Sequence, residues 1–213
     1  EKTFGEKLKD YVIYFSVFLS LILGIGIFIL LPSYMVNIFK AAGIPPTLKT
    51  IIEGAVRITL FIIYISLVSK MKDIQRVFMY HGAEHKSIHC YESGDELTVE
   101  NVRAKSRLHP RCGTSFLLIV MIVSIFVFML IPAQTTWLGR AGYRLLLLPI
   151  VAGTAYEIIK IAGRYDNRFT RIISAPGMWL QKITTKEPDD SQIEVAIVSL
   201  KSVIPQNPEE DKW

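Results

Sequence analysis

The chain carries the run His81-Gly82-Ala83-Glu84-His85, which reads H-x-x-E-H. On a helix, residues four apart share one face, so His81 and His85 can direct their imidazoles at one metal ion. Glu84 lies about 60° from His81 around such a helix, close enough to activate a water on that metal. This is the inverted form of the zinc-peptidase motif H-E-x-x-H. The spacing predicts a site for zinc or another divalent transition metal, with Glu84 catalytic if the protein is an enzyme.

A third ligand is needed, and the sequence leaves four candidates open. Glu157 lies in an apolar stretch, where a charge costs roughly 2.5–3.5 kcal/mol on insertion scales and therefore needs a function such as metal binding. The alternative is that Glu157 forms an ion pair with a basic neighbour such as Lys160. His109 and Cys112 have H-x-x-C spacing in a loop and could complete a His₂Cys or His₃ site. The alternative is that this loop has only a structural role. Glu92 shares the face of His81 and His85 and is suited to orient a ring nitrogen.

Four apolar stretches are long enough to cross a bilayer, which takes about 20 residues. Mean hydropathy is +0.36 and 51% of residues are hydrophobic, more than is usual for a soluble domain of 213 residues. The first stretch is longer than the core of a signal peptide and no small-x-small cleavage site follows it. The predicted spans are Tyr11–Leu31, Ile51–Val68, Ser115–Ile131 and Tyr143–Ala162. We therefore predict a polytopic, all-α membrane protein.

Basic residues predict the orientation of these spans, because short loops rich in Lys and Arg stay in the cytoplasm. Eight basic residues lie between Lys70 and Thr114, whereas the turn between spans three and four holds Arg140 alone. We expect a multi-pass protein of the bacterial inner membrane with both termini, and the H-x-x-E-H run, in the cytoplasm. Cys90 and Cys112 are then reduced thiols. No basic stripe with interleaved aromatics is present, and nucleic-acid binding is not expected.

The predicted organisation is a four-span domain over residues 1–186, with a helical cytoplasmic loop at 70–114 and an amphipathic tail. The motif helix would continue from span two and end near Gly94, and Thr98 would cap a short helix over Val99–Lys105. Residues 167–186 would lie along the membrane surface.

Residues 187–204 would form a helix capped by Asp189-Asp190-Ser191, whose apolar stripe packs on its own protein. Residues 205–213 would be disordered. Glu53 and Arg57, four apart in span two, are predicted to form a structural ion pair. Arg111 is interpreted as an anchor at the cytoplasmic surface.

Four strings in the chain resemble the bacterial YqhQ-like family: Tyr80–Lys86, His109–Phe116, Tyr156–Lys160 and Glu187–Glu194. The family consists of multi-span membrane proteins described as predicted metal-dependent enzymes of unknown function. The resemblance implies a functional set of His81, Glu84, His85, His109, Cys112 and Glu157. Family members usually have a Gly-rich soluble segment before the first span, and this chain, which begins at Glu1 without an initiator Met, lacks it.

Two functions fit these observations. The first is a non-enzymatic factor for assembly, translocation or quality control of membrane proteins, in which the metal fastens the cytoplasmic loop to the spans. It would work in the lipid bilayer with other membrane proteins as partners, and we favour it because small four-span proteins without a visible catalytic cleft are often subunits. The absence of a strand that would bind an extended substrate argues against a peptidase. The alternative is a membrane-embedded zinc metallohydrolase or peptidase, in which Glu84 takes a proton from the attacking water. Replacing Glu84 by Gln separates the two.

Overall fold

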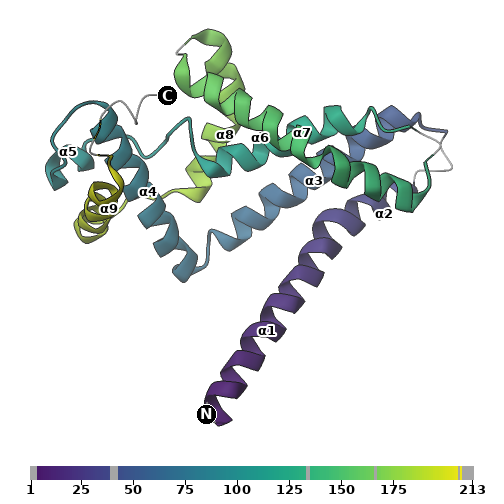
Figure 1. Ribbon diagram of the computed structural model, residues 1–213, viewed down its shortest axis with the longest axis horizontal. Helices are drawn as coiled ribbons and strands as arrows, with labels where there is room; N and C mark the ends of the chain where they lie inside the picture. The colour runs from purple at the N-terminus through teal and green to yellow at the C-terminus, as the bar shows by residue number, and fades with distance from the viewer. Residues whose placement is uncertain (1–3, 39–42, 133–134, 166, 206, 208–213) are drawn as a thin grey trace.

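The computed structural model describes residues 4–38, 43–132, 135–165, 167–205 and 207, and within these ranges the chain forms helices and no strand (Figure 1). The all-α prediction is confirmed. Most of the predicted disordered tail, 206 and 208–213, lies outside the described residues. The helices are α1 (Phe4–Ile25), the short π-helix η1 (Gly26–Leu30), α2 (Leu31–Ile38), α3 (Pro46–Val68), α4 (Lys72–Glu92), α5 (Val99–Arg103), α6 (Gly113–Phe128), α7 (Trp137–Arg164), α8 (Arg168–Thr184) and α9 (Asp190–Val203).

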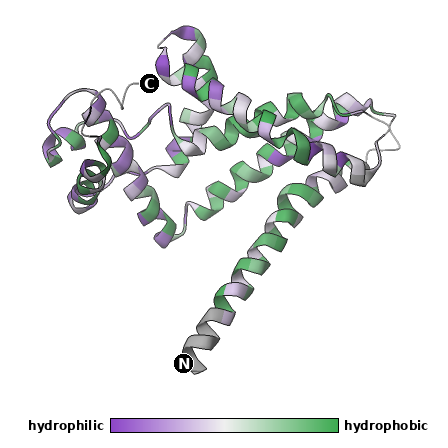
Figure 2. Ribbon diagram, viewed as in Figure 1, coloured by the Kyte–Doolittle hydropathy of each residue, from purple (hydrophilic) through white to green (hydrophobic). Residues whose placement is uncertain are grey.

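Three of the described helical segments are long and apolar enough to cross a membrane: Tyr11–Val36, Pro46–Val68 and Gly139–Arg164. The remaining predicted span, Ser115–Ile131, corresponds to α6, which has 16 residues. At 1.5 Å per residue this helix is about 24 Å long, shorter than a bilayer core of about 30 Å. Figure 2 shows apolar residues along α1, α3, α6 and α7. The chain is therefore a membrane-associated protein with three candidate spans and one shorter apolar helix.

A core of small and branched side chains joins α6 to α7. Ile119 and Val123 of α6 pack with Val151 and Ala155 of α7, and all four are buried. Because α6 starts at Gly113, this packing fixes the preceding residue, Cys112, beside the polar part of the molecule.

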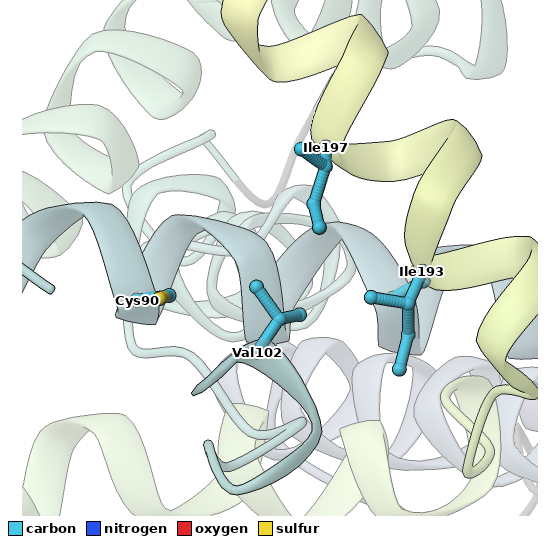
Figure 3. Close-up of a cluster of buried hydrophobic side chains, with 5 residues drawn as sticks. Cys90, Val102, Ile193 and Ile197 are labelled. Atoms are coloured by element: carbon cyan, nitrogen blue, oxygen red, sulfur yellow. The ribbon is translucent and has the colours of Figure 1, made fainter. Parts of the chain in front are cut away.

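The second core lies in the polar part and joins α4, α5 and α9. Cys90 of α4, Val102 of α5, and Ile193 and Ile197 of α9 point toward one another (Figure 3). The apolar stripe of α9 thus packs on its own protein, as predicted. The predicted caps are also confirmed: Thr98 Oγ1 accepts from Asn101 N, and Asp189 forms a capping box on α9.

The junction between α3 and α4 differs from the prediction of one continuous helix. Helix α3 ends at Val68 and α4 begins at Lys72, with Met71 in an extended conformation between them. The end of α4 agrees with the prediction, since Gly94 follows Glu92 and has a φ of 72°, which favours glycine. The break allows α4 to leave the direction of α3 (Figure 1).

Helix α8 buries polar side chains as well as Leu180. Thr170, Gln181 and Thr184 are buried against the protein, whereas Phe169 and Ile172 are 67% and 71% exposed. The exposed side also carries basic residues, among them Arg168 and Arg171. That residues 167–186 lie along the membrane surface stays a prediction.

Candidate metal centre

Two helical histidines and one cysteine from a distant loop converge on one point. His81 and His85 lie one turn apart on α4, and their ring centroids are 4.4 Å apart. Cys112, the residue before α6, lies with its Sγ atom 3.3 Å from Nε2 of His81. One potential ligand atom from each of the three residues lies within 4.8 Å of the others. The three side chains therefore form a group of the size and type that holds a transition metal.

Hydrogen bonds to backbone carbonyls orient both imidazoles. His81 Nδ1 lies 2.9 Å from the carbonyl oxygen of Thr184, and His85 Nδ1 lies 2.7 Å from that of Arg107. A carbonyl oxygen only accepts, so each Nδ1 carries the proton and donates it. When such a ring binds a metal it is neutral, and the lone pair that it offers is then on Nε2. This is the arrangement found around metal-binding histidines, where a carbonyl or carboxylate holds the other nitrogen.

Gly82 makes the carbonyl of Thr184 available to His81. An added Cβ at Gly82 would lie 2.0 Å from the carbonyl oxygen of Lys186, and Lys186 N donates to the carbonyl oxygen of Phe78 at 2.8 Å. The segment that follows α8 therefore runs directly against α4 beside the first histidine. The glycine inside the motif allows this close approach.

The electrostatics of the group favour a thiolate at Cys112. Burial raises the pKa of the thiol, but hydrogen bonds with His81, His85 and Thr114 outweigh it and lower the pKa to about 5. For His81, burial lowers the pKa, but the bonds to Cys112 and to the Thr184 carbonyl outweigh this and raise it. A thiolate is the form of cysteine that binds metals.

Glu84 lies on the same side of α4 as this group and faces open space. Its side chain is exposed and lines a cavity of about 460 Å³ together with His81, His85 and Cys112. The end of α9 forms an apolar wall of the same cavity. The residues of that wall are Leu200, Val203, Ile204 and Pro205.

His109 lies beside this group but uses both of its ring nitrogens elsewhere. Its Nε2 is 3.1 Å from Glu92 Oε2, and its Nδ1 accepts from the backbone N–H of Arg111 at 3.2 Å. The ring is 5.9 Å from that of His85, centroid to centroid. His109, His89 and Glu92 form a second group of potential ligands.

The second group is a hydrogen-bonded network with a basic partner. Arg111 forms an ion pair with Glu92, and His89 Nε2 donates to the carbonyl oxygen of Leu108 at 2.8 Å. For Glu92, burial raises the pKa, but His109 and Arg111 outweigh it and lower the pKa. Burial lowers the pKa of His89. Glu92 thus orients a ring nitrogen, as expected, but the ring is that of His109. Arg111 contacts a carboxylate rather than acting only as a surface anchor.

The remaining predicted ligand, Glu157, is in neither group. It lies on α7 and its side chain is exposed, whereas the groups found among the described residues come from α4 and from the segment before α6. Of the four candidates for a third ligand, Cys112 is the one that the fold brings to His81 and His85.

Gln181 of α8 and Lys86 of α4 support the site, and sequence reasoning did not identify them. Buried Gln181 accepts from His109 N at 2.8 Å and donates to the His109 carbonyl at 2.7 Å. Buried Lys86 donates to the carbonyls of Arg103 and Lys105 and pairs with Glu187. A Lys immediately after the motif carries no spacing signal, because its partners, two backbone carbonyls and the Glu187 carboxylate, are distant along the chain.

Comparisons with known proteins give a family without an assigned activity. The sequence profile of the family described as "Protein of unknown function (DUF1385)" matches residues 1–206. The chain is 40% identical over 187 residues to "Uncharacterized protein YqhQ" of Bacillus subtilis (strain 168). That match covers 87% of this chain and 58% of the relative. No solved structure matches the chain.

Proposed function

The chain belongs to the DUF1385 family, which has no described function, and we propose from its site that it is a membrane-associated, metal-dependent hydrolase. The bond cleaved would be an amide or an ester, and zinc is the metal that fits best. One observation carries the proposal: His81, His85 and Cys112 offer three ligands beside a cavity that also contains the carboxylate of Glu84. Catalytic zinc sites have three protein ligands and one open position, whereas structural sites have four protein ligands.

The residues present suit zinc. Two imidazole nitrogens and one thiolate form a mixed donor set of borderline softness, which zinc accepts in tetrahedral geometry. Both Nε2 atoms are available because the Nδ1 atoms donate to carbonyls. Zinc bound here would supply a water that is acidic near neutral pH and would polarise a substrate carbonyl.

Side chains and backbone carbonyls of the protein would carry out the other steps. Glu84 would accept a proton from the attacking water and pass it to the leaving group, the role of general acid and base. The carbonyls of Thr184 and Arg107 would keep the two imidazoles in the tautomer that presents Nε2. The apolar wall at the end of α9 would receive the apolar part of the substrate. We also propose that the protein lies in the bacterial inner membrane with both termini in the cytoplasm.

Two measurements test the metal and its open position. Elemental analysis of the purified protein should find about one zinc per chain, lost when His81 and His85 are both replaced by Ala. In the cobalt-loaded protein, acetohydroxamate should change the visible spectrum, since it can bind only at an open position. Glu84→Gln should keep both the metal and the spectral response while losing hydrolysis. Absence of metal, or a cobalt spectrum unaffected by acetohydroxamate, would contradict the hydrolase.

A non-enzymatic factor for membrane-protein assembly, translocation or quality control is the second candidate. The exposed face of α8, with Phe169, Ile172 and Trp179, supports it, because such a face can contact lipid or another membrane protein. The metal would then fasten α4 to the segments around Cys112 and Thr184. This candidate predicts a closed cobalt site and full function of Glu84→Gln in cells that lack the native protein.

A further inference from the structure

A buried ionic network lies far from the metal centre, among the membrane helices. Glu53 of α3 is 8% exposed. Its Oε1 atom accepts from Arg57 at 3.0 Å and lies 2.9 Å from Nη2 of Arg144 on α7. Ser33 of α2 donates to the same carboxylate at 3.0 Å. The predicted pair of Glu53 and Arg57 is confirmed, and Arg144 joins it.

The network has more positive than negative charge. One carboxylate faces two guanidinium groups, and the Nε atom of Arg144 is buried without a hydrogen-bond partner among the described residues. Uncompensated charge in a low-dielectric region is costly, and an added anion would relieve it. Arg140 lies one turn before Arg144 on α7, and both guanidinium groups line one cavity.

Both arginines line a second cavity, of about 340 Å³, whose other residues come from the start of α3, the end of α6 and the segment that follows α6. The cavity also has an apolar wall, which consists of residues Phe128, Met129, Leu130, Ile131 and Pro132. Phe128 lies against the Arg144 guanidinium, 5.6 Å from its Cζ atom to the ring centroid. The ends of apolar membrane helices lie at the depth of lipid headgroups. The cavity thus combines guanidinium donors with an apolar wall at the membrane interface.

We propose that this cavity binds the phosphate of a membrane phospholipid between Arg140 and Arg144, with the upper part of an acyl chain along residues 128–132. Guanidinium forks match phosphate oxygens in geometry, and such pairs are strong where water is scarce. Glu53 holds Arg144 in place. The apolar wall favours a lipid over free phosphate. The site is independent of the proposed hydrolase.

The test measures thermal unfolding of the detergent-purified full chain with three probes. Dioleoylphosphatidylglycerol has the phosphate and the chains, dioleoylglycerol lacks the phosphate, and glycerol 3-phosphate lacks the chains. We expect a rise in the unfolding midpoint with the phospholipid alone. Native mass spectrometry should show one bound phospholipid per chain.

Two variants control the test. The double variant Arg140→Gln, Arg144→Gln should bind the phospholipid at least about tenfold more weakly. Arg164→Gln, at the other end of α7 and away from the cavity, should bind it normally. An equal effect of dioleoylglycerol, or undiminished binding by the double variant, would overturn the proposal. If glycerol 3-phosphate raised the unfolding midpoint as much as the phospholipid does, the ligand would be a soluble phosphate and the lipid proposal would be wrong.

Discussion

The Sγ atom of Cys112 lies 3.3 Å from Nε2 of His81, although 31 residues separate them in the chain. Helix packing explains the contact. Helix α6 is fixed against α7 and α8 through its buried residues, and the segment after α8 runs against Gly82 of α4. Cys112, at the start of α6, is thereby held over the face of α4 that carries the motif.

The cysteine should be reactive in the metal-free protein. With a pKa lowered to about 5, Cys112 is a thiolate throughout the range from pH 6 to pH 8, so its alkylation by iodoacetamide should change little across that range. Cys90, whose pKa is raised by burial, should react slowly and faster as the pH rises. Mass spectrometry of the two peptides measures both rates.

Zinc should protect Cys112 from the same reagent, because a coordinated thiolate is a weaker nucleophile. The protection should vanish in the variant that lacks His81 and His85. A rate at Cys112 that rises about tenfold per pH unit up to pH 8 would show an ordinary thiol with a pKa near its usual value.

Gly82→Ala should destabilise the protein and loosen the site. The new Cβ would meet the carbonyl oxygen of Lys186 at 2.0 Å, a backbone atom that can move only if the segment after α8 leaves α4. We expect a loss of about 2–3 kcal/mol of stability, a typical cost of overpacking, and weaker zinc binding, since the Thr184 carbonyl moves with that segment.

Gly153→Ala is the matched control for this substitution. Gly153 lies within α7 and an added Cβ there has open space, so alanine should stabilise the helix by up to about 1 kcal/mol. Thermal unfolding in detergent compares the two variants. Equal effects would mean that the contact between residues 82 and 186 is not tight.

Gln181→Met should cost roughly 1–3 kcal/mol, because it leaves buried polar groups of His109 and Ser115 without their partners. The methionine has a similar volume, so the loss reports hydrogen bonding rather than packing. Gln75→Met removes one bond, to the carbonyl of Lys70, at an exposed position and should be nearly neutral. Denaturation of both variants gives the comparison.

Local patterns in the sequence predicted the local features of the structure. The caps at Thr98 and Asp189, the end of α4 near Gly94, and the pair of Glu53 and Arg57 all depend on residues within four positions of each other. Such signals need no knowledge of the fold.

Features that depend on distant contacts were not predictable in the same way. Nothing in the spacing distinguished Cys112 from Glu157 or His109 as the partner of the two motif histidines. Arg144 and the carbonyl of Thr184 were missed because their partners lie 91 and 103 residues away. The break at Met71 was missed since residues 69–71 contain neither glycine nor proline.

The identity of the third ligand can be decided by metal content. Cys112→Ser should reduce bound zinc far below one per chain, because a hydroxyl is not deprotonated near pH 7 and coordinates zinc weakly. Glu157→Gln should keep the metal, since Glu157 lies on α7 outside both ligand groups. His109→Gln should also keep it, because the His109 ring nitrogens are engaged by Glu92 and Arg111. Elemental analysis of the three purified variants separates these outcomes. If zinc were lost in Glu157→Gln but kept in Cys112→Ser, the metal would instead lie between α4 and α7. The cavity beside Glu84 would then not be the reaction site.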